Sequence, residues 1–210
     1  MIKPRELVVA RYNEDISWSD CFKCYRTVYN KGEKIKGVEC ITLPNVGREA
    51  HTYLYHIIHN WDNLAEKTMF SQGGLLKHGL SSEDIEIFFA APGLFKTGKF
   101  FRDSNWGYIN HVGKWAQEKS SGRMQKAELS FGEWFDRVIQ VPRGRYYYFR
   151  SGANFCVSKE AIKNRPRSFY EYLIRRVSHH VNPEEGHYLE RSWLYIFCPS
   201  ITNPLNAGEF

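Results

Sequence analysis

The first third of the chain combines short apolar runs with one stretch of helical periodicity. The run ELVVARY ends at the polar NEDIS, which predicts a buried first strand that leads into a functional loop. RTVYNKG predicts a second strand closed by a turn, and TMFSQGG predicts a third strand with its terminal loop. Between them, apolar side chains at helical spacing predict an amphipathic helix that opens with a glycine-containing turn near Asn45. These side chains are Tyr53, Leu54, Ile57, Ile58 and Trp61.

The order of these elements predicts the fold class. Strand, strand, helix and strand in succession are typical of an α/β sheet. Ligands of such sheets bind beyond the carboxyl ends of the strands. Residues 12–15, 45–49 and 72–78 follow those ends or open the intervening helix. We therefore expect these three segments at one edge of the sheet.

The middle of the chain is less regular. LSSEDIEIFFAAPG predicts a helix with a capping box formed by Ser81 and Asp84, ended by Pro92 and Gly93. The stretch FFRDSNWGYINHVGKWAQEKSSGRMQKAE then mixes aromatic residues, glycines and charges without a sustained period. We expect mostly loop there, with a short helix.

The last third predicts one strand and three helices. A strand at about 153–157 leads into a helix capped by Ser158, and SFYEYLIRRVSHH predicts the next helix, after Pro166. GHYLERSWLYIF predicts a final helix whose apolar stripe is Tyr188, Leu189, Trp193, Ile196 and Phe197. No internal repeat or low-complexity linker divides the 210 residues, so we expect a single domain over residues 1–210.

Composition bounds the class of protein. The chain is 42% hydrophobic, which is enough for one sizeable core, and its net charge of +6 would suit an anionic ligand, nucleic acid or anionic lipid. No apolar run long enough for a signal peptide or a membrane span occurs. We therefore expect a soluble, cytoplasmic protein without a membrane span.

The cysteines fit a reducing compartment, because their number is odd and no Asn-x-Ser/Thr sequon occurs. Cys21 and Cys24 have the spacing of a redox or zinc pair. No second such pair follows, and their aromatic neighbours favour a packing role. The five cysteines are Cys21, Cys24, Cys40, Cys156 and Cys198.

Several pieces of the sequence together resemble a known family. VVARYNEDISW, YNKG, LPNVGREAHTYLYHI, FSQG, GANFCVSKEAI and EEGHYLERSWLYIF resemble fungal, bacterial and viral proteins related to glycosyltransferases of the GT-A fold. These relatives include the N-terminal domain of a chlorella virus glycosyltransferase that acts on the major capsid protein. The resemblance runs from about residue 6 to residue 198, nearly the whole chain.

The resemblance implies a fold and an activity. It implies a single GT-A-like, Rossmann-related domain with a central mixed sheet flanked by helices. The nucleotide-sugar-binding half would cover about residues 1–95 and the acceptor half about residues 96–210. The implied reaction moves a sugar from a nucleoside diphosphate sugar, with a UDP-sugar favoured, to a glycan or glycoprotein acceptor, with inversion.

The donor site must stabilise negative charge on a diphosphate leaving group, by a metal, by Arg or Lys, or by helix N-terminal amides. Arg48 meets this need at the turn that opens the predicted helix. In the related enzymes the loop after the first strand holds the base, which implies stacking by Tyr12. The alternative for this loop is a helix cap with solvated charges. The expected nucleotide-sugar-binding residues are Arg11, Tyr12, Asn13, Asp15, Asn45, Gly47, Arg48, Gln72, Gly73, Lys77 and Arg191.

The expected metal site is where the sequence departs from the family. GT-A enzymes commonly carry Asp-x-Asp after the third strand to hold Mn²⁺ or Mg²⁺. Residues 71–80 read SQGGLLKHGL and contain no carboxylate. Gln72 and His78 could serve as weak ligands, and Lys77 could replace the charge of the cation. Dependence on Mn²⁺ or Mg²⁺ therefore stays open.

Glu190 is the candidate general base. An inverting transfer needs a carboxylate that takes the proton of the acceptor hydroxyl, and the resemblance implies that it comes from the start of a late helix. Glu185 is the second candidate, and Arg191 stands beside Glu190 for a phosphate or an ion pair. The alternative is structural: first-turn charges and ion pairs at the edge of the core.

The acceptor is expected near the predicted strand-to-helix turn SGANFCVSKEA. Gly152 lets a backbone approach closely, and Asn154 can form hydrogen bonds with hydroxyl groups. Trp106 could stack on a sugar, although each aromatic residue of the irregular middle could equally belong to the core.

Two other functions are considered. Arg and Lys interleave with Tyr around residues 143–150 and 163–176, as in proteins that bind single-stranded nucleic acid. The charges are spread over several segments and no nucleic-acid-binding motif occurs, so nucleic acid is not the favoured partner. The missing Asp-x-Asp also suits a catalytically inactive domain that only binds a sugar nucleotide or glycan.

Overall fold

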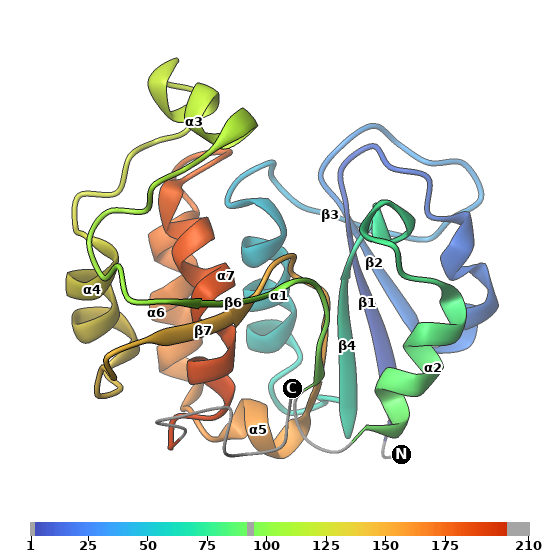
Figure 1. Ribbon diagram of the computed structural model, residues 1–210. Coiled ribbons are helices and arrows are strands. Elements are labelled where there is room, and N and C mark those ends of the chain that lie inside the picture. Colours follow the sequence, from blue (N-terminus) through green and yellow to red (C-terminus); the bar gives the residue numbers. More distant parts are fainter. Residues whose placement is uncertain (1–2, 92–94, 201–210) are drawn as a thin grey trace.

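A mixed six-stranded sheet forms the centre of the computed structural model, which describes residues 3–91 and 95–200 (Figure 1). The strand order is β3-β2-β1-β4-β8-β5. Strands β1 to β4 run parallel where they pair, and β8 is antiparallel to both β4 and β5. The strands are β1 (Arg5–Arg11), β2 (Arg26–Asn30), β3 (Ile41–Thr42), β4 (Lys67–Gln72), β5 (Phe95–Lys96) and β8 (Phe155–Ser158). The α/β prediction is confirmed.

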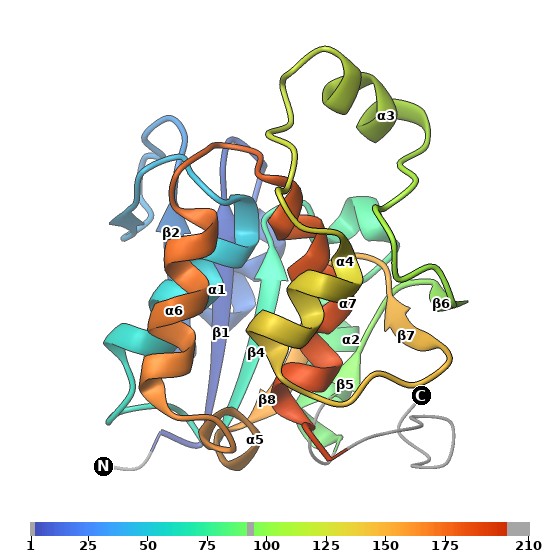
Figure 2. The same cartoon turned by 90° about the vertical axis from the view of Figure 1, so that its left-hand side faces the viewer.

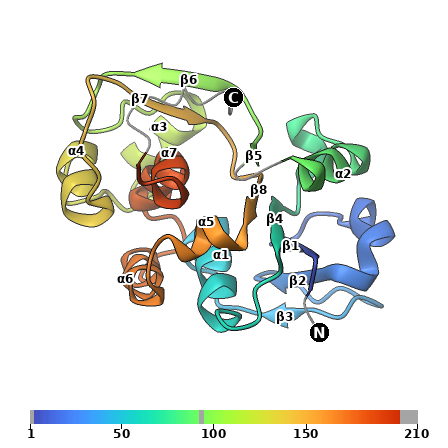
Figure 3. The ribbon, with the colours of Figure 1, turned by 90° about the horizontal axis from the view of Figure 1, so that it is seen from below.

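Helices cover both faces of this sheet (Figures 2 and 3). One face carries α1 (Arg48–His59), α5 (Lys159–Lys163), α6 (Arg167–Val177) and α7 (Glu184–Phe197). The other face carries α2 (Ser82–Ala90) and the 3₁₀ helix η1 (Ser17–Tyr25). In β1, Val8 packs into the first core while Leu7 and Val9 pack into the second. Alternate side chains of a strand face opposite sides, so an apolar run such as LVV fills two cores.

Most predicted elements are confirmed, together with their local signals. Ser81 and Asp84 form the capping box of α2, and Ser158 caps α5 by accepting from the amide of Ala161 at 3.2 Å. Helix α6 begins after Pro166. The apolar stripe predicted on the last helix is buried in α7. The predicted ending of α2 at Pro92 and Gly93 lies outside the described residues.

The irregular middle contains more structure than predicted. Strands β6 (Phe100–Asp103) and β7 (Tyr147–Arg150) form a separate two-stranded sheet. Helix α3 (Gly113–Ser120) and the short helix α4 (Phe131–Trp134), which continues into a π-helical turn over Phe135–Ile139, lie between them. Phe101 and Phe149 stack across the strand pair with centroids 5.0 Å apart. Within residues 100–128 the expected short helix is α3, and the rest is irregular apart from β6. Strand β6 was not predicted, because long-range pairing leaves no local period.

No helix in the described part of the chain is long and apolar enough to cross a membrane.

Candidate functional site

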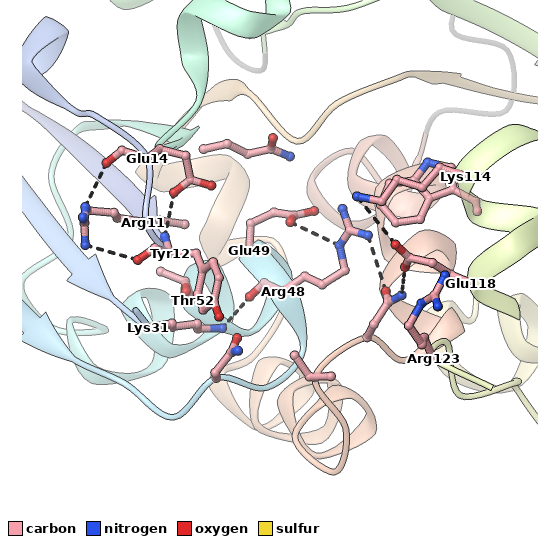
Figure 4. A pocket seen from close by; sticks show the side chains of 16 residues that line it. Arg11, Tyr12, Glu14, Lys31, Arg48, Glu49, Thr52, Lys114, Glu118 and Arg123 are labelled. Atoms are coloured by element: carbon pink, nitrogen blue, oxygen red, sulfur yellow. Dashed lines mark hydrogen bonds and ion pairs between the residues drawn. The ribbon is translucent and has the colours of Figure 1, made fainter. Parts of the chain in front are cut away.

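A pocket of about 490 Å³ opens at the carboxyl edge of the parallel strands (Figure 4). The ends of β1 and β4, the residue after β2 and the first turn of α1 form one wall, while the α3 segment and residues 181–182 form the other. We call it the sheet-edge pocket. Its lining residues are Ala10, Arg11, Tyr12, Glu14, Lys31, Asn45, Arg48, Glu49, Thr52, Gln72, Lys114, Trp115, Glu118, Arg123, Val181 and Asn182. The three segments that the sequence predicted at one edge all contribute to it or border it.

The turn that opens α1 has an unusual backbone. Gly47 is left-handed with φ of 60°, and Arg48 follows with φ of 51°, a region that residues other than glycine rarely adopt. A Cβ on Gly47 would lie 2.5 Å from the carbonyl oxygen of Val177, so only glycine fits there. Gly47 also offers no side-chain cap, which leaves the first-turn amides of α1 to other partners at the pocket wall.

The side chain of Arg48 crosses to the opposite wall of the pocket. Its guanidinium carbon lies 4.3 Å from the ring centroid of Trp115. Its Nη1 lies 3.4 Å from Oδ1 of Asn182, and its Nε lies 3.6 Å from Oε2 of Glu49. Arg48 therefore brings a half-buried positive charge next to the uncapped start of α1, and this arrangement favours an anion.

Lys31 lies beneath the same turn. Its Nζ donates to the carbonyl oxygens of Val46, at 2.6 Å, and Arg48. Burial lowers the pKa of Lys31 to about 7, while the charge of Glu49 acts in the opposite direction. Two carbonyl acceptors favour the ammonium form, so Lys31 supports the left-handed turn, and its protonated fraction adds positive charge to the pocket.

The loop after β1 contains one side chain that stabilises it and one that is exposed to a ligand. Arg11 is buried, and it donates to Oδ1 of Asn30 at 2.7 Å and to the carbonyl oxygens of Tyr12, Glu14 and Glu33. Tyr12 is exposed in the pocket wall and can stack on a planar ring. Arg11 therefore holds the loop that presents Tyr12.

Asn13 and Asp15 stabilise the same loop and do not line the pocket. Oδ1 of Asn13 accepts from the amide of Glu33 at 2.8 Å. Asp15 accepts from the amide and the hydroxyl of Ser17, and these hydrogen bonds lower its pKa. Asp15 is therefore an exposed charge that binds the first residue of η1, although the N-cap of that helix is Ile16.

At the end of β4, Gln72 lines the pocket, and its Oε1 accepts from Nε2 of His78 at 2.8 Å. The amide of Gly73 donates to the carbonyl of Ala10 at 2.8 Å, and a Cβ there would lie 2.9 Å from Glu14. Gly73 therefore allows the two loops to approach closely. Lys77 is exposed and does not line the pocket.

The sequence predicted a short helix in the region of α3 but not that it forms a wall of the pocket. Helix α3 buries none of its residues, so no apolar stripe marks it. It is fastened by Glu184, which is fully buried and accepts from Lys119 Nζ at 2.5 Å, from His111 Nε2 at 2.9 Å and from the amide of Ala127 at 3.0 Å. Burial alone would raise the pKa of Glu184, but these hydrogen bonds outweigh it and lower the pKa to about 2. A buried carboxylate thus positions Trp115 over Arg48.

Glu190 lies on α7 and is not one of the residues that line the pocket. Its Oε1 accepts from the amide of Gly152 at 2.5 Å, and its Oε2 lies 3.9 Å from Nδ1 of His187. Gly152 has φ of 80°, and a Cβ on it would lie 3.8 Å from Nδ1 of His78. The backbone of Gly152 therefore lies between Glu190 and His78, which binds Gln72 in the pocket wall. Burial lowers the pKa of His187.

The remaining predicted site residues lie away from the sheet-edge pocket or serve packing. Glu185 is buried and pairs with Arg176, and burial raises its pKa. Arg191 donates to the carbonyl of His187 at 3.0 Å and lies over Phe149. Neither Glu185 nor Arg191 lines the sheet-edge pocket.

Two predicted acceptor residues have similar structural contacts. Asn154 is buried, and its Oδ1 accepts from the amide of Gln72 at 3.0 Å, which joins β8 to β4. Trp106 stacks on Phe131 with centroids 5.4 Å apart and donates to the carbonyl of Gly144. Both side chains support the walls around the site.

The residues after β4 do not suit a hard divalent cation. Within the described residues, no group of three or more His, Cys, Asp or Glu side chains is arranged to hold a metal ion. Gln72 and His78 bond to each other, and carboxylates, the ligands that Mg²⁺ and Mn²⁺ prefer, are missing from residues 71–80.

Residues 7–83 match the model of a family described as "Protein of unknown function (DUF3431)". The matched segment carries Tyr12, Lys31, Arg48 and Gln72, so the sheet wall of the pocket lies within it. Neither a curated protein nor a solved structure matches the chain.

Proposed function

We propose that this chain is a glycosyltransferase that binds a nucleoside diphosphate sugar in the sheet-edge pocket. The proposed reaction moves the sugar to a glycan or glycoprotein acceptor. The observation that carries the proposal is the convergence of Arg48, Lys31 and the uncapped start of α1 in a pocket at the carboxyl edge of the parallel strands. Ligands of α/β sheets bind at this edge, and a helix N-terminus beside cations suits a diphosphate.

The other pocket residues suit the remaining parts of such a donor. Tyr12 offers an exposed ring for the base. Glu14 and Glu49 offer carboxylates that can accept hydrogen bonds from ribose or sugar hydroxyls. A volume of about 490 Å³ lies within the range of small-molecule sites.

In the proposed reaction, the acceptor oxygen bonds to the anomeric carbon as the bond from that carbon to the diphosphate oxygen breaks. The acceptor oxygen attacks from the face opposite the leaving group, which inverts the configuration at the anomeric carbon. Glu190 takes the proton of the acceptor hydroxyl. Arg48, Lys31 and the first-turn amides of α1 stabilise the charge that develops on the diphosphate. Support for Glu190 is that it binds the amide of Gly152, which neighbours His78, and that His78 binds Gln72 of the pocket wall.

Nucleic acid remains the less favoured partner, because several basic residues of the sequence clusters already have partners. Arg143 pairs with Asp136 at 2.8 Å, and Arg167 pairs with Glu171 at 3.0 Å. Arg165 donates to the carbonyl of Ile139 at 3.0 Å.

A thermal-shift panel of UDP-, GDP- and dTDP-sugars, with and without Mn²⁺, tests the proposal. A ligand at 100 times its dissociation constant adds about 2.7 kcal/mol of stability. Sugar transfer or donor hydrolysis is then measured with the nucleotide that gives the largest shift. Binding without turnover would favour the inactive sugar-nucleotide-binding alternative, and no shift with any nucleotide would contradict both.

A further inference from the structure

The element that follows the Tyr12 loop carries two exposed cysteines. Helix η1 is anchored by Trp18 and Phe22, which are buried in the second core. Cys21 and Cys24 both lie on its solvent side, contrary to the packing role that their aromatic neighbours suggested. Their thiols are accessible without unfolding.

The geometry of η1 brings residues three apart together. Side chains at i and i+3 eclipse in a 3₁₀ helix. Two such pairs on η1 are in contact: Nζ of Lys23 lies 3.8 Å from Oδ1 of Asp20, and the rings of Phe22 and Tyr25 are 5.7 Å apart. Cys21 and Cys24 form the third column of the same helix. A rise of about 2 Å per residue separates their Cα atoms by roughly 6 Å, within the range of disulfides.

We propose that Cys21 and Cys24 form a reversible dithiol–disulfide site on the surface beside the sheet-edge pocket. The oxidant is a small disulfide of the glutathione class. The thiolate of one cysteine attacks a sulfur of glutathione disulfide, forms a mixed disulfide and releases one glutathione thiolate. The thiolate of the second cysteine then attacks the cysteine sulfur of the mixed disulfide and releases the second glutathione. The two cysteines lose two protons and two electrons, which the oxidant takes up as two thiols.

The other cysteines are less suited to this reaction. Cys156 is buried in β8, and burial raises its pKa to about 12, so little thiolate forms. Cys40 and Cys198 are half-buried and have no cysteine three residues away. The second step is therefore expected only within η1.

The site is connected to the pocket through Trp18. The carbonyl of Trp18 accepts from Sγ of Cys21 at 3.6 Å and from the hydroxyl of Ser82 at 2.8 Å. Its indole Nε1 donates to the carbonyl of Gly73 at 2.9 Å, next to Gln72 in the pocket wall. The contacts of Trp18 with Cys21 and with Gly73 would thus connect a disulfide at this position to the pocket wall.

The test is to incubate the reduced full chain with glutathione disulfide, quench with acid, and measure the intact mass and the peptide map. The wild type is expected to lose the mass of two hydrogens, with a disulfide between Cys21 and Cys24 that dithiothreitol reverses. C21S and C24S are each expected to stop at the mixed disulfide and gain one glutathione. Melting temperatures of the reduced variants, expected to equal that of the wild type, show that both are folded.

The matched control is the C40S/C198S double variant, which is expected to close as the wild type does. A wild type that keeps glutathione adducts without closing, or that does not react at Cys21 and Cys24, would overturn the proposal. So would a disulfide that maps to Cys40 or Cys198.

Discussion

The guanidinium of Arg48 lies over the indole of Trp115, with its central carbon 4.3 Å from the ring centroid. Arg48 opens the helix that packs on the central sheet, whereas Trp115 belongs to α3, which buries no residue of its own. The contact joins the two walls of the sheet-edge pocket. The pocket therefore depends on a cation at the start of α1 and on an aromatic ring whose helix is held by the buried carboxylate of Glu184.

The backbone of Arg48 gives a prediction about stability. A left-handed conformation costs a residue other than glycine about 1–2 kcal/mol, whereas glycine costs about 0.4–1 kcal/mol through the entropy of the unfolded chain. R48A and R48G remove the same contacts of the side chain and differ mainly in this backbone term. We expect R48G to be more stable than R48A by about 0.5–1 kcal/mol in urea denaturation. An R48A variant more stable than R48G would contradict the left-handed geometry at this position.

The role of Glu184 predicts a coupled loss of order and binding. E184Q removes the charge that accepts from His111 and Lys119 inside the protein, and breaking a buried ion pair costs about 3–5 kcal/mol. We expect faster amide hydrogen exchange over residues 113–120 and weaker nucleotide binding. E171Q, which removes an exposed pair with Arg167, is the matched control and is expected to change neither. Unchanged exchange in E184Q would show that α3 is held in some other way.

Two buried histidines predict a loss of stability in acid. Burial lowers the pKa of both His51 and His56 to about 4, from 6.5 in the unfolded chain. Between pH 6.5 and 4 the unfolded state therefore holds more protons, so the free energy of unfolding falls as the pH falls through this window. Each histidine contributes a slope of up to about 1.4 kcal/mol per pH unit.

Urea denaturation at several pH values measures this slope. H56Q is expected to flatten it, because one of the two groups is removed. The exposed His59 provides the control, and H59Q is expected to leave the slope unchanged. A free energy of unfolding that rises as the pH falls from 6.5 to 4 would contradict the burial of these rings.

Glu190 yields a prediction about catalysis. In E190Q the amide oxygen can still accept from the amide of Gly152, but the side chain can no longer take a proton. We expect the transfer rate to fall by about 10²- to 10⁴-fold while the donor dissociation constant is unaltered. Rate and melting curve are measured on one preparation. A destabilised variant with the full rate per folded molecule would make Glu190 structural and leave the base to be found elsewhere.

The sheet wall of the site was predictable because its signals are local. The run LVVAR, the glycine before Arg48 and the end of TMFSQ each mark a strand end or a helix start within a few residues. Lys31, the polar residue directly after the second strand, carries the same local signal of a residue at the sheet edge.

The α3 wall was not predictable from local pattern. Its position depends on Glu184, which lies far along the chain from His111 and Lys119. The roles of Arg11 and Asn154 were also not readable, because hydrogen bonds to distant backbone and side-chain atoms occupy both. The residue type limits which contacts a side chain can form, and the tertiary fold determines which of them form.

The most direct test of the account is a calorimetric titration of the best-binding nucleoside diphosphate sugar into wild type, R48M and K163M. Lys163 lies 4.3 Å from the ring centroid of Trp61, so K163M also removes a cation from a tryptophan face, but outside the sheet-edge pocket. A charge-assisted hydrogen bond to phosphate contributes about 1.5–3 kcal/mol, so R48M is expected to bind about 10- to 150-fold more weakly. K163M is expected to bind as the wild type does. Equal affinities of wild type and R48M, or equal losses in R48M and K163M, would contradict a diphosphate site at the start of α1.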